Sequence, residues 1–320
     1  MDYKQIIEQN YDVQVKSIDL IDCHFGTCIY RVETKENDFF CKVRPSYDEN
    51  IKNEYEITEF LYNKGFPVAR LLKTKNGNLG VTVDQKYLNI QEFISGTTPE
   101  INTAPDWLMK KSAELLGRLH VLLRGFKQLP NQFGECFFRP DTAEMKKLFL
   151  ETKLQEQREK NNIDVLRKWK AQIKHLAKIS MFSIDTAKLT YANSHGDYHI
   201  GQTILNDRNI TIIDWASACG MPVSLEIITS YVFAAPECRS GKINADELTE
   251  YIRNYKRFSP LTTYDIGAMP YLFYFWHTIC NYLPSEEIPL SYQSISKLIN
   301  NMLNWLYGNA DKLSYELLKR

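Results

Sequence analysis

Two short apolar runs, separated by a polar turn and each close to an aspartate, constrain this chain more than any other feature. Residues 203–205 (TIL) and 210–213 (ITII) flank the turn residues 206–209 (NDRN), a pattern typical of two β-strands joined in a hairpin. Asp197 precedes the first run and Asp214 follows the second. We expect this hairpin to hold both carboxylates at the rim of one cleft.

A carboxamide completes this group of polar side chains, because Gln202 lies five residues after Asp197. Phosphoryl transfer requires a positioned acceptor hydroxyl and metal ions that neutralise charge on the β- and γ-phosphates. Asp197 is suited to orient and deprotonate an acceptor. Gln202 and Asp214 offer the oxygen ligands that Mg²⁺ prefers.

Two other interpretations apply to the same stretch. His195 and His199 stand four residues apart, as in a zinc-binding helix, but Gly196 replaces the glutamate of the HExxH pattern and disfavours a helix. Each aspartate alone is more simply a turn residue, the commonest fate of Asp in a loop. The joint spacing of the three polar residues favours a functional site.

The segments HGDYHIGQTIL (195–205) and IIDW (212–215) resemble the catalytic and metal-binding segments of the aminoglycoside phosphotransferase and choline kinase family, whose fold resembles that of protein kinases. The resemblance implies that Asp197 is catalytic, that His195 supports the catalytic loop, and that Gln202 and Asp214 bind metal. The family usually has Asn where Gln202 stands. Gln keeps the carboxamide oxygen but adds a methylene, which changes the metal geometry.

The N-terminal part of the chain is predicted to be mainly strands. Lys42 lies near the end of one of them, a costly place for a charge unless it has partners. The resemblance implies that Lys42 contacts the α- and β-phosphates of ATP and pairs with a glutamate of the next helix. Glu54 and Glu56 are both candidates, and the family spacing favours Glu54. The predicted elements are helices at 3–9 and 50–64 and strands at 15–20, 28–32, 39–43, 68–72, 80–83 and 87–94.

Two further segments match nucleotide-contacting positions of the family. The turn at 22–27 lies where a kinase loop would cover the phosphates, although Gly26 is its one glycine and an ordinary hairpin turn has the same pattern. Gln91, Glu92, Phe93 and Ile94 match the hinge between lobes, where backbone groups recognise adenine. The alternative for this second segment is a plain edge strand.

From residue 105 onward, the apolar residues recur at the spacing of an amphipathic helix. Glu226 stands where the family commonly has an aspartate that braces the catalytic loop, and His120 is interpreted as a core histidine. The aromatic stripe at 271–282 is either core packing or a wall that stacks on a sugar ring or encloses a quaternary ammonium. The predicted helices are 105–124, 142–160, 164–178, 222–233, 246–258, 264–283 and 292–318.

We therefore predict an α+β, two-lobed, protein-kinase-like fold, with an antiparallel N-terminal sheet in residues 1–92 and a mostly helical C-lobe in residues 93–320. A chain of 320 residues is long enough for two lobes with separate cores. Its 39 basic and 39 acidic residues balance, so nothing favours nucleic acid or an anionic membrane as a partner. The sequence makes no prediction of oligomeric state.

The seven cysteines include no CxxC pair, which argues against a disulfide framework and a zinc site and for a reducing compartment. The N-terminal residues lack the apolar core of a signal peptide. The most apolar run, 271–283, is too short to cross a bilayer. We expect a soluble, cytoplasmic protein.

The predicted function is transfer of the ATP γ-phosphoryl group, with Mg²⁺, to a hydroxyl of a small molecule. Aminoglycoside-like antibiotics, sugars, amino alcohols such as choline, and homoserine-like acceptors all remain candidates. The nine acidic and nine basic residues from Ser230 onward give no carboxylate surplus for a polycation. The alternative is a non-catalytic, kinase-like nucleotide-binding or structural protein of the spore-coat kind. Gln202 and the glycine-poor turn favour it, and the joint presence of Lys42, Asp197 and Asp214 opposes it.

Overall fold

The computed structural model describes residues 2–24, 26–131, 138–156, 163–179, 184–280 and 290–320. The chain forms two compact units, residues 1–99 with 201–218 and residues 100–200 with 219–320. Residues 93–99 and 201–218 fall in the first of these units, and they are joined to each other and to Pro67 by backbone hydrogen bonds. Thr97 and Leu205 exchange backbone hydrogen bonds of 2.8 and 2.9 Å, and Ile212 N donates to Pro67 O.

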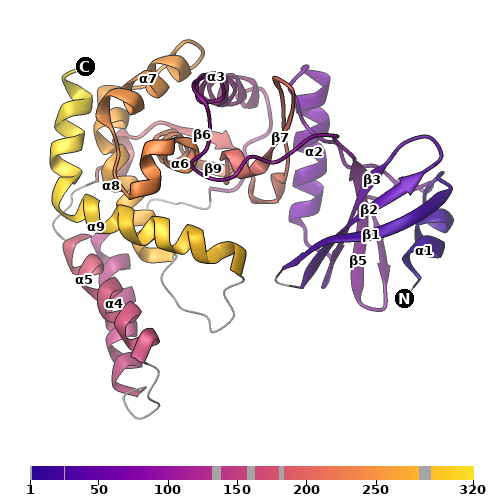
Figure 1. Ribbon diagram of the computed structural model, residues 1–320, viewed down its shortest axis with the longest axis horizontal. Helices are drawn as coiled ribbons and strands as arrows, with labels where there is room; N and C mark the ends of the chain where they lie inside the picture. The colour runs from indigo at the N-terminus through magenta and orange to yellow at the C-terminus, as the bar shows by residue number, and fades with distance from the viewer. Residues whose placement is uncertain (1, 25, 132–137, 157–162, 180–183, 281–289) are drawn as a thin grey trace. The chain divides into compact units, whose positions relative to one another are not determined.

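The first unit is built on a five-stranded antiparallel sheet in the order β1-β2-β3-β5-β4 (Figure 1). This sheet confirms the predicted antiparallel N-terminal sheet. Its strands and the accompanying helices are α1 (Tyr3–Asn10), β1 (Val15–His24), β2 (Thr27–Thr34), β3 (Phe39–Arg44), α2 (Asn50–Asn63), β4 (Val81–Val83) and β5 (Lys86–Glu92).

Helices α1 and α2 cover opposite faces of this sheet (Figure 1). Along β3, Cys41 and Val43 pack in one apolar cluster with Ile7 of α1. Because side chains alternate along a strand, Lys42 points to the other face. That face is covered by α2, whose Ile51 packs in a second cluster. The alternation of side chains along β3 therefore directs Lys42 toward α2.

The predicted hairpin around residues 203–213 is confirmed, since β7 (Thr203–Asn206) pairs antiparallel with β8 (Asn209–Ile212). The predicted strand at 68–72 is wrong. Its residues make single bridges, Val68 to Ile212 and Leu71 to Gln91, instead of a continuous ladder. The segment divides its backbone hydrogen bonds between β8 and β5, so it does not form a strand with either.

A disulfide joins Cys23 and Cys28, with a Cα–Cα distance of 4.0 Å. The sequence argued against a disulfide framework and did not predict this bridge. In the β1–β2 hairpin, Cys23 lies directly opposite Cys28, and the next pair is His24 with Thr27. The register of the strands brings the two sulfur atoms together, and the spacing of the cysteines in the sequence has no CxxC pattern that would indicate it.

The described residues of the second unit are mainly helical, and β6 (Tyr191–Ser194) pairs with β9 (Cys219–Pro222) in a two-stranded antiparallel sheet. The predicted helices are present, although their predicted residues 157–160 and 281–283 lie outside the described part of the chain. The two-stranded sheet was not predicted. The helices are α3 (Asp106–Leu123), α4 (Pro140–Glu156), α5 (Ile163–Ile179), α6 (Val223–Ala234), α7 (Ala245–Lys256), α8 (Thr263–Cys280) and α9 (Leu290–Leu318).

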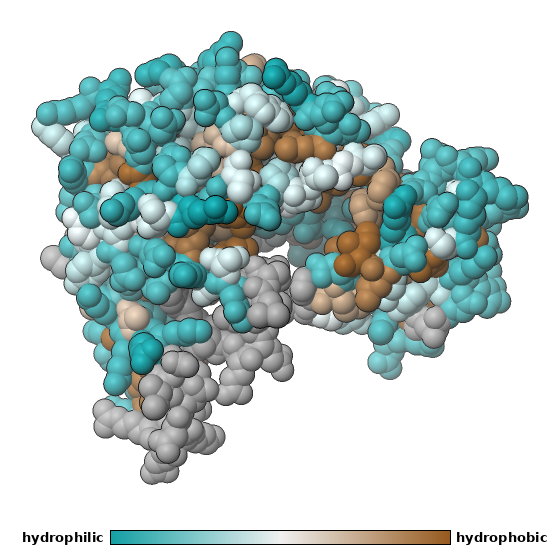
Figure 2. Space-filling model, viewed as in Figure 1, coloured by the Kyte–Doolittle hydropathy of each residue, from teal (hydrophilic) through white to brown (hydrophobic). Residues whose placement is uncertain are grey.

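The surface drawn in Figure 2 is mostly hydrophilic, with scattered apolar patches. In the described residues, none of the helices combines the length and the apolar character needed to span a bilayer.

Candidate active site

Lys42 of the first unit lies at the centre of a group of charged side chains. Its side chain is 8% exposed, and its Nζ lies 2.9 Å from Asp214 Oδ1 and 3.7 Å from Glu54 Oε1. The second oxygen of Glu54 accepts a hydrogen bond of 3.0 Å from Arg44 Nη2. We call Lys42, Arg44, Glu54 and Asp214 the lysine cluster. Every charge in the cluster has a partner of opposite sign.

The structure distinguishes the two candidate partners of Lys42. The Glu54 side chain is 2% exposed and faces the sheet. Glu56, two residues later on α2, lies 3.9 Å from Lys52 Nζ, because residues two apart on a helix point in different directions. The predicted ion pair of Lys42 with Glu54 is therefore present. The role of this pair toward a nucleotide stays a prediction.

The lysine cluster keeps Lys42 charged. Burial alone would lower the pKa of Lys42, because a buried ammonium loses its hydration. The carboxylates of Glu54 and Asp214 outweigh burial and raise this pKa above its ordinary value of 10.5. Lys42 is thus a permanent positive charge at neutral pH.

Asp214 follows β8 in a left-handed backbone conformation, with φ 61° and ψ 66°. Asp adopts this region more readily than most residues, at a cost of roughly 1 kcal/mol. Its side chain is 45% exposed, although its oxygen contacts Lys42. Ile213 N donates to Gln202 O at 3.0 Å, so the β7–β8 hairpin brings the main chains at the two predicted metal positions together.

Gly26 lies in the turn of the β1–β2 hairpin with φ 79°. A Cβ atom there would come within 2.9 Å of Pro45 Cγ, so both the backbone angle and the space favour glycine. This turn therefore packs against the residue that follows β3, two positions after Val43.

The predicted hinge residues begin in an internal strand. Because β5 lies between β3 and β4, the alternative of a plain edge strand is wrong. Glu92 Oε1 accepts a hydrogen bond of 2.9 Å from Arg70 Nε, and the Phe93 ring lies 4.8 Å from that of Phe40. Gln91 is buried, and Ile94 follows the strand. The Gln91–Ile94 segment is thus fixed by contacts within the first unit.

In the second unit, a buried hydrogen-bond network holds the loop before Asp197. His120 Nε2 donates to Glu226 Oε2 at 2.7 Å, and His120 Nδ1 lies 2.7 Å from the Tyr255 hydroxyl. The other oxygen of Glu226 accepts a hydrogen bond of 2.7 Å from Gly196 N. We call His120, Glu226 and Tyr255 the histidine brace. Its contact with Gly196 agrees with the bracing role expected for Glu226.

Asp197 itself is open to solvent, with 45% of its side chain exposed. His199 Nε2 lies 3.5 Å from Asp197 Oδ1, and the His199 ring stacks on Phe233. Asp197 N donates to the fully buried His195 ring, at 3.3 Å from Nδ1. The His277 ring lies 6.2 Å from that of Phe233, and burial lowers the pKa of His277 to about 3, although Asp197 opposes this shift.

The sequence reasoning missed several residues near these groups. Arg44 gave a signal, since it is a second charge two positions after Lys42 on the same face of β3. His277 gave none, because it lies in a long aromatic helix 80 positions after Asp197 in the chain. Long-range contacts of this kind leave no local pattern.

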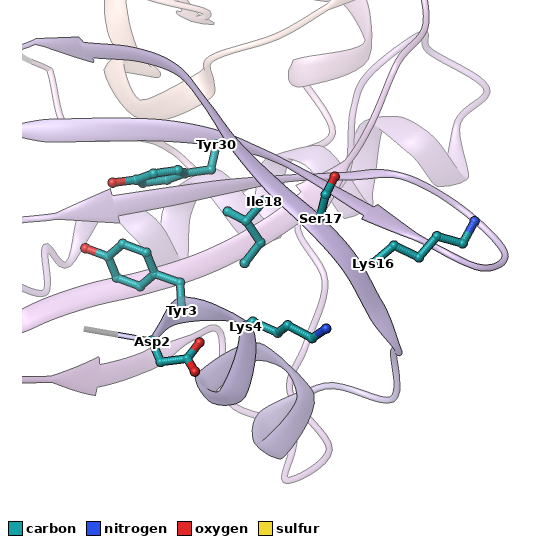
Figure 3. A pocket seen from close by; sticks show the side chains of 7 residues that line it. All are labelled: Asp2, Tyr3, Lys4, Lys16, Ser17, Ile18 and Tyr30. Atoms are coloured by element: carbon teal, nitrogen blue, oxygen red, sulfur yellow. The ribbon is translucent and has the colours of Figure 1, made fainter.

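A hollow of about 600 Å³ lies on the α1 side of the sheet (Figure 3). The ring of Tyr3 lies 5.1 Å from that of Tyr30 there. Lys42 points to the opposite face of the sheet, so this hollow is not part of the lysine cluster. It is lined by Asp2, Tyr3, Lys4, Lys16, Ser17, Ile18 and Tyr30.

Solved structures with the same fold include several small-molecule kinases. The amicoumacin kinase hAmiN, in complex with AMP-PNP, Ca²⁺ and Ami, matches with a TM-score of 0.64 and 12% identity over 98% of this chain and 94% of that one. A spectinomycin phosphotransferase, in complex with ADP and spectinomycin, matches at 0.60 and 15% over 98% and 96%. The choline kinase LicA from Streptococcus pneumoniae matches at 0.54 and 13% over 94% and 98%. No curated protein matches the chain.

The family comparison covers residues 29–261, well over half of the chain, and matches the phosphotransferase enzyme family (APH). The matched range includes the lysine cluster, the β7–β8 hairpin and the histidine brace. The predicted family and the predicted kinase-like fold are confirmed. The chain therefore belongs to the phosphotransferase enzyme family, whose members act as small-molecule kinases.

Proposed function

We propose that this protein transfers the γ-phosphoryl group of ATP to a hydroxyl group of a small molecule. The observation that carries the proposal is the lysine cluster, in which Lys42 contacts both Glu54 on the next helix and Asp214 after the β7–β8 hairpin. Kinases use a strand lysine with a helix glutamate to hold phosphates, and an aspartate to hold the metal.

Within this proposal, Glu54 positions the lysine. Arg44 fixes one oxygen of Glu54, and the other oxygen lies near Lys42. The charged Nζ of Lys42 then donates to oxygens of the α- and β-phosphates. Because the cluster is formed before a nucleotide binds, little reorganisation accompanies the reaction.

The donor set near Asp214 fits Mg²⁺. Mg²⁺ in kinase sites is held by one or two protein oxygen ligands together with phosphate oxygens and water. The exposed carboxylate of Asp214 and the carboxamide of Gln202 are ligands of this type. When bound, Mg²⁺ neutralises charge that develops on the phosphoryl group.

Asp197 is the proposed general base. Its exposed carboxylate would accept the proton of the acceptor hydroxyl, while His195 and the histidine brace hold the preceding loop. We assign adenine recognition to backbone groups of residues 91–94 and phosphate contacts to backbone amides of the turn that contains Gly26. ATP as the donor agrees with the predicted cytoplasmic location, which stays a prediction.

The acceptor is proposed only as a class, a small molecule that carries a hydroxyl group. The structures with this fold include kinases of amicoumacin, spectinomycin and choline. An assay of ADP release with a panel of antibiotics, sugars, choline and homoserine would identify the acceptor of this chain.

Substitution of Asp197 tests the proposal. Asp197→Asn should lower the transfer rate by about 10³-fold, a usual loss for a general base, and leave the KM for ATP within about threefold. Asp207→Asn makes the same change on an exposed turn of the β7–β8 hairpin and should have no effect. Asp214→Ala should instead weaken binding of Mg·ATP. Full transfer activity of Asp197→Asn would contradict the assignment.

A non-catalytic nucleotide-binding or structural protein is the second candidate, favoured by Gln202 and by the glycine-poor turn. Slow, magnesium-dependent ATP hydrolysis without acceptor distinguishes the two. The kinase should show it, and Asp197→Asn should abolish it. Wild-type protein that binds ATP but releases no ADP with any acceptor would support the second candidate.

A further inference from the structure

His199 is a close neighbour of Asp197 to which the proposed function gives no role. Its Nε2 atom lies 3.5 Å from Asp197 Oδ1. The side chain of His199 is 14% exposed, whereas that of Asp197 is 45% exposed. The contact therefore joins a carboxylate that a ligand can reach to a ring that the protein largely covers.

The His199 ring is held by stacking. It lies 5.2 Å from the ring of Phe233 in α6, with an angle of 27° between the two planes. Phe233 is itself buried, and its ring lies 6.2 Å from that of His277 in α8. A stacked ring contacts its neighbour through its face, whereas its nitrogen atoms lie at its edge. The stack therefore restricts the ring of His199 without using Nε2.

The backbone on both sides of Asp197 is anchored. The side chain of the next residue, Tyr198, is buried, and its hydroxyl donates a hydrogen bond of 3.0 Å to Ser112 O. The preceding residue, Gly196, donates its N–H to Glu226 of the histidine brace. Since the backbone is fixed, rotation about the side-chain bonds of Asp197 is the main freedom that its carboxylate keeps.

We propose that His199 is a positioning residue, which donates a hydrogen bond from Nε2 to Asp197 Oδ1 and holds the carboxylate in the orientation that accepts the proton. This inference rests on the proposed function, because His199 acts through the general base. The distance of 3.5 Å is longer than an ordinary hydrogen bond, and hydrogen bonds of catalytic groups commonly shorten when the substrate binds. The proton passes from the acceptor hydroxyl to Asp197, and His199 keeps its own proton throughout.

The test measures ADP release from Mg·ATP with water as the acceptor, in the full chain and in two variants of His199. His199→Ala removes the donor and should lower kcat by about 30-fold, the effect of losing one hydrogen bond to a charged group, with the KM for ATP within about twofold. His199→Gln puts an amide N–H near the position of Nε2 and should restore kcat to within about fivefold of wild type. Because glutamine does not take up a proton, this rescue separates positioning from proton acceptance by His199.

Two substitutions of buried phenylalanines test the stack. Phe233→Leu removes the ring that stacks on His199 and should lower kcat by about fivefold, the usual strength of one aromatic pair. Phe273→Leu is the matched control, because Phe273 is also buried but its ring lies 4.2 Å from that of His277. It should leave kcat within about twofold, since a core substitution of this kind acts mainly on stability. Urea unfolding checks that each variant is folded.

A wild-type kcat in His199→Ala would overturn the positioning role, as would a His199→Gln variant that is as slow as His199→Ala. Equal losses of kcat in Phe233→Leu and Phe273→Leu would overturn the role of the stack. Absence of ADP release by the wild-type protein, with water and with every acceptor of the panel, is a different result, which would contradict the proposed function itself.

Discussion

The lysine cluster and the histidine brace both pair acidic with basic side chains, but they differ in solvent access. In the histidine brace, the side chains of His120 and Glu226 are 1% and 2% exposed, and the two oxygens of Glu226 contact His120 Nε2 and Gly196 N. In the lysine cluster, the Asp214 carboxylate is 45% exposed. A closed network of this kind can only hold the chain in place. An open carboxylate beside a buried amine can exchange its partner for a ligand.

Backbone geometry supports the same distinction. Asp214 has a left-handed backbone, and residues in sparsely populated conformations gather at functional sites. Glu226 lies in the regular helix α6, where its carboxylate meets the backbone of Gly196. We therefore expect substitutions in the lysine cluster to affect activity and substitutions in the histidine brace to affect stability.

The largest expected effect is that of Lys42→Met on activity. The variant removes the charge but keeps the length of the side chain, and kcat/KM for ATP should fall by about 10³-fold. The free energy of unfolding should change by less than about 1 kcal/mol, because Glu54 keeps its hydrogen bond to Arg44 and Asp214 is exposed to water. Steady-state kinetics and urea unfolding measure the two quantities.

Lys52→Met is the matched control for this variant. Lys52 lies on the exposed surface of α2, 66% exposed, and its weak pair with Glu56 is not part of the cluster. It should change neither kinetics nor stability. If Lys42→Met kept the wild-type kcat/KM and lost several kcal/mol of stability, the lysine cluster would be a structural group like the histidine brace.

The features that could be predicted from the sequence are those for which neighbouring residues form a recognisable pattern. Lys42 was found because a charge inside an apolar strand requires partners, and the β7–β8 hairpin was found from two apolar runs around a polar turn. The choice of Glu54 over Glu56 came from the family spacing. Each of these features is indicated by residues that are close to it in the sequence.

Contacts between distant segments were not predicted where they lie outside the family motifs. His120 and Glu226 are 106 positions apart, and no local pattern connects them. The Cys23–Cys28 bridge depends on strand register, and the division of residues 67–72 between β5 and β8 depends on two partners at once. The left-handed conformation of Asp214 has no sequence signal because Asp also adopts ordinary turns.

The second prediction concerns Glu226→Ala in the histidine brace. It removes the acceptor of two buried donors, Gly196 N–H and the His120 ring, and should lower the free energy of unfolding by about 3 kcal/mol. The KM for ATP of the folded fraction should be unchanged, since the lysine cluster is intact. Urea unfolding at neutral pH measures the loss.

The control for Glu226→Ala is Glu250→Ala on α7. Glu250 is 54% exposed and pairs with Arg253 one helical turn away, so its removal should cost less than about 0.5 kcal/mol. Equal losses for the two variants would show that the buried network contributes no more than a surface ion pair, and the distinction between the two clusters would fail.

The third and smallest effect is a loss of stability at acid pH, which comes from His175 in the second unit. Burial lowers the pKa of His175 to about 4, below the unperturbed value of about 6.5. The unfolded chain binds a proton more readily than the folded chain in this window. Stability is therefore complete above about pH 6.5 and is lost as pH falls toward 4, by up to about 2 kcal/mol between pH 7.5 and 5.

His175→Gln tests this dependence. It removes the titrating group, and the slope of unfolding free energy against pH between 7 and 5 should decrease by up to about 1.4 kcal/mol per pH unit. Gln172→Met removes a neighbouring buried hydrogen bond without a titrating group, so it should lower stability equally at all pH values. The raised pKa of Lys42, in contrast, affects stability only in alkali. An unchanged slope in His175→Gln would mean that the acid sensitivity comes from other groups.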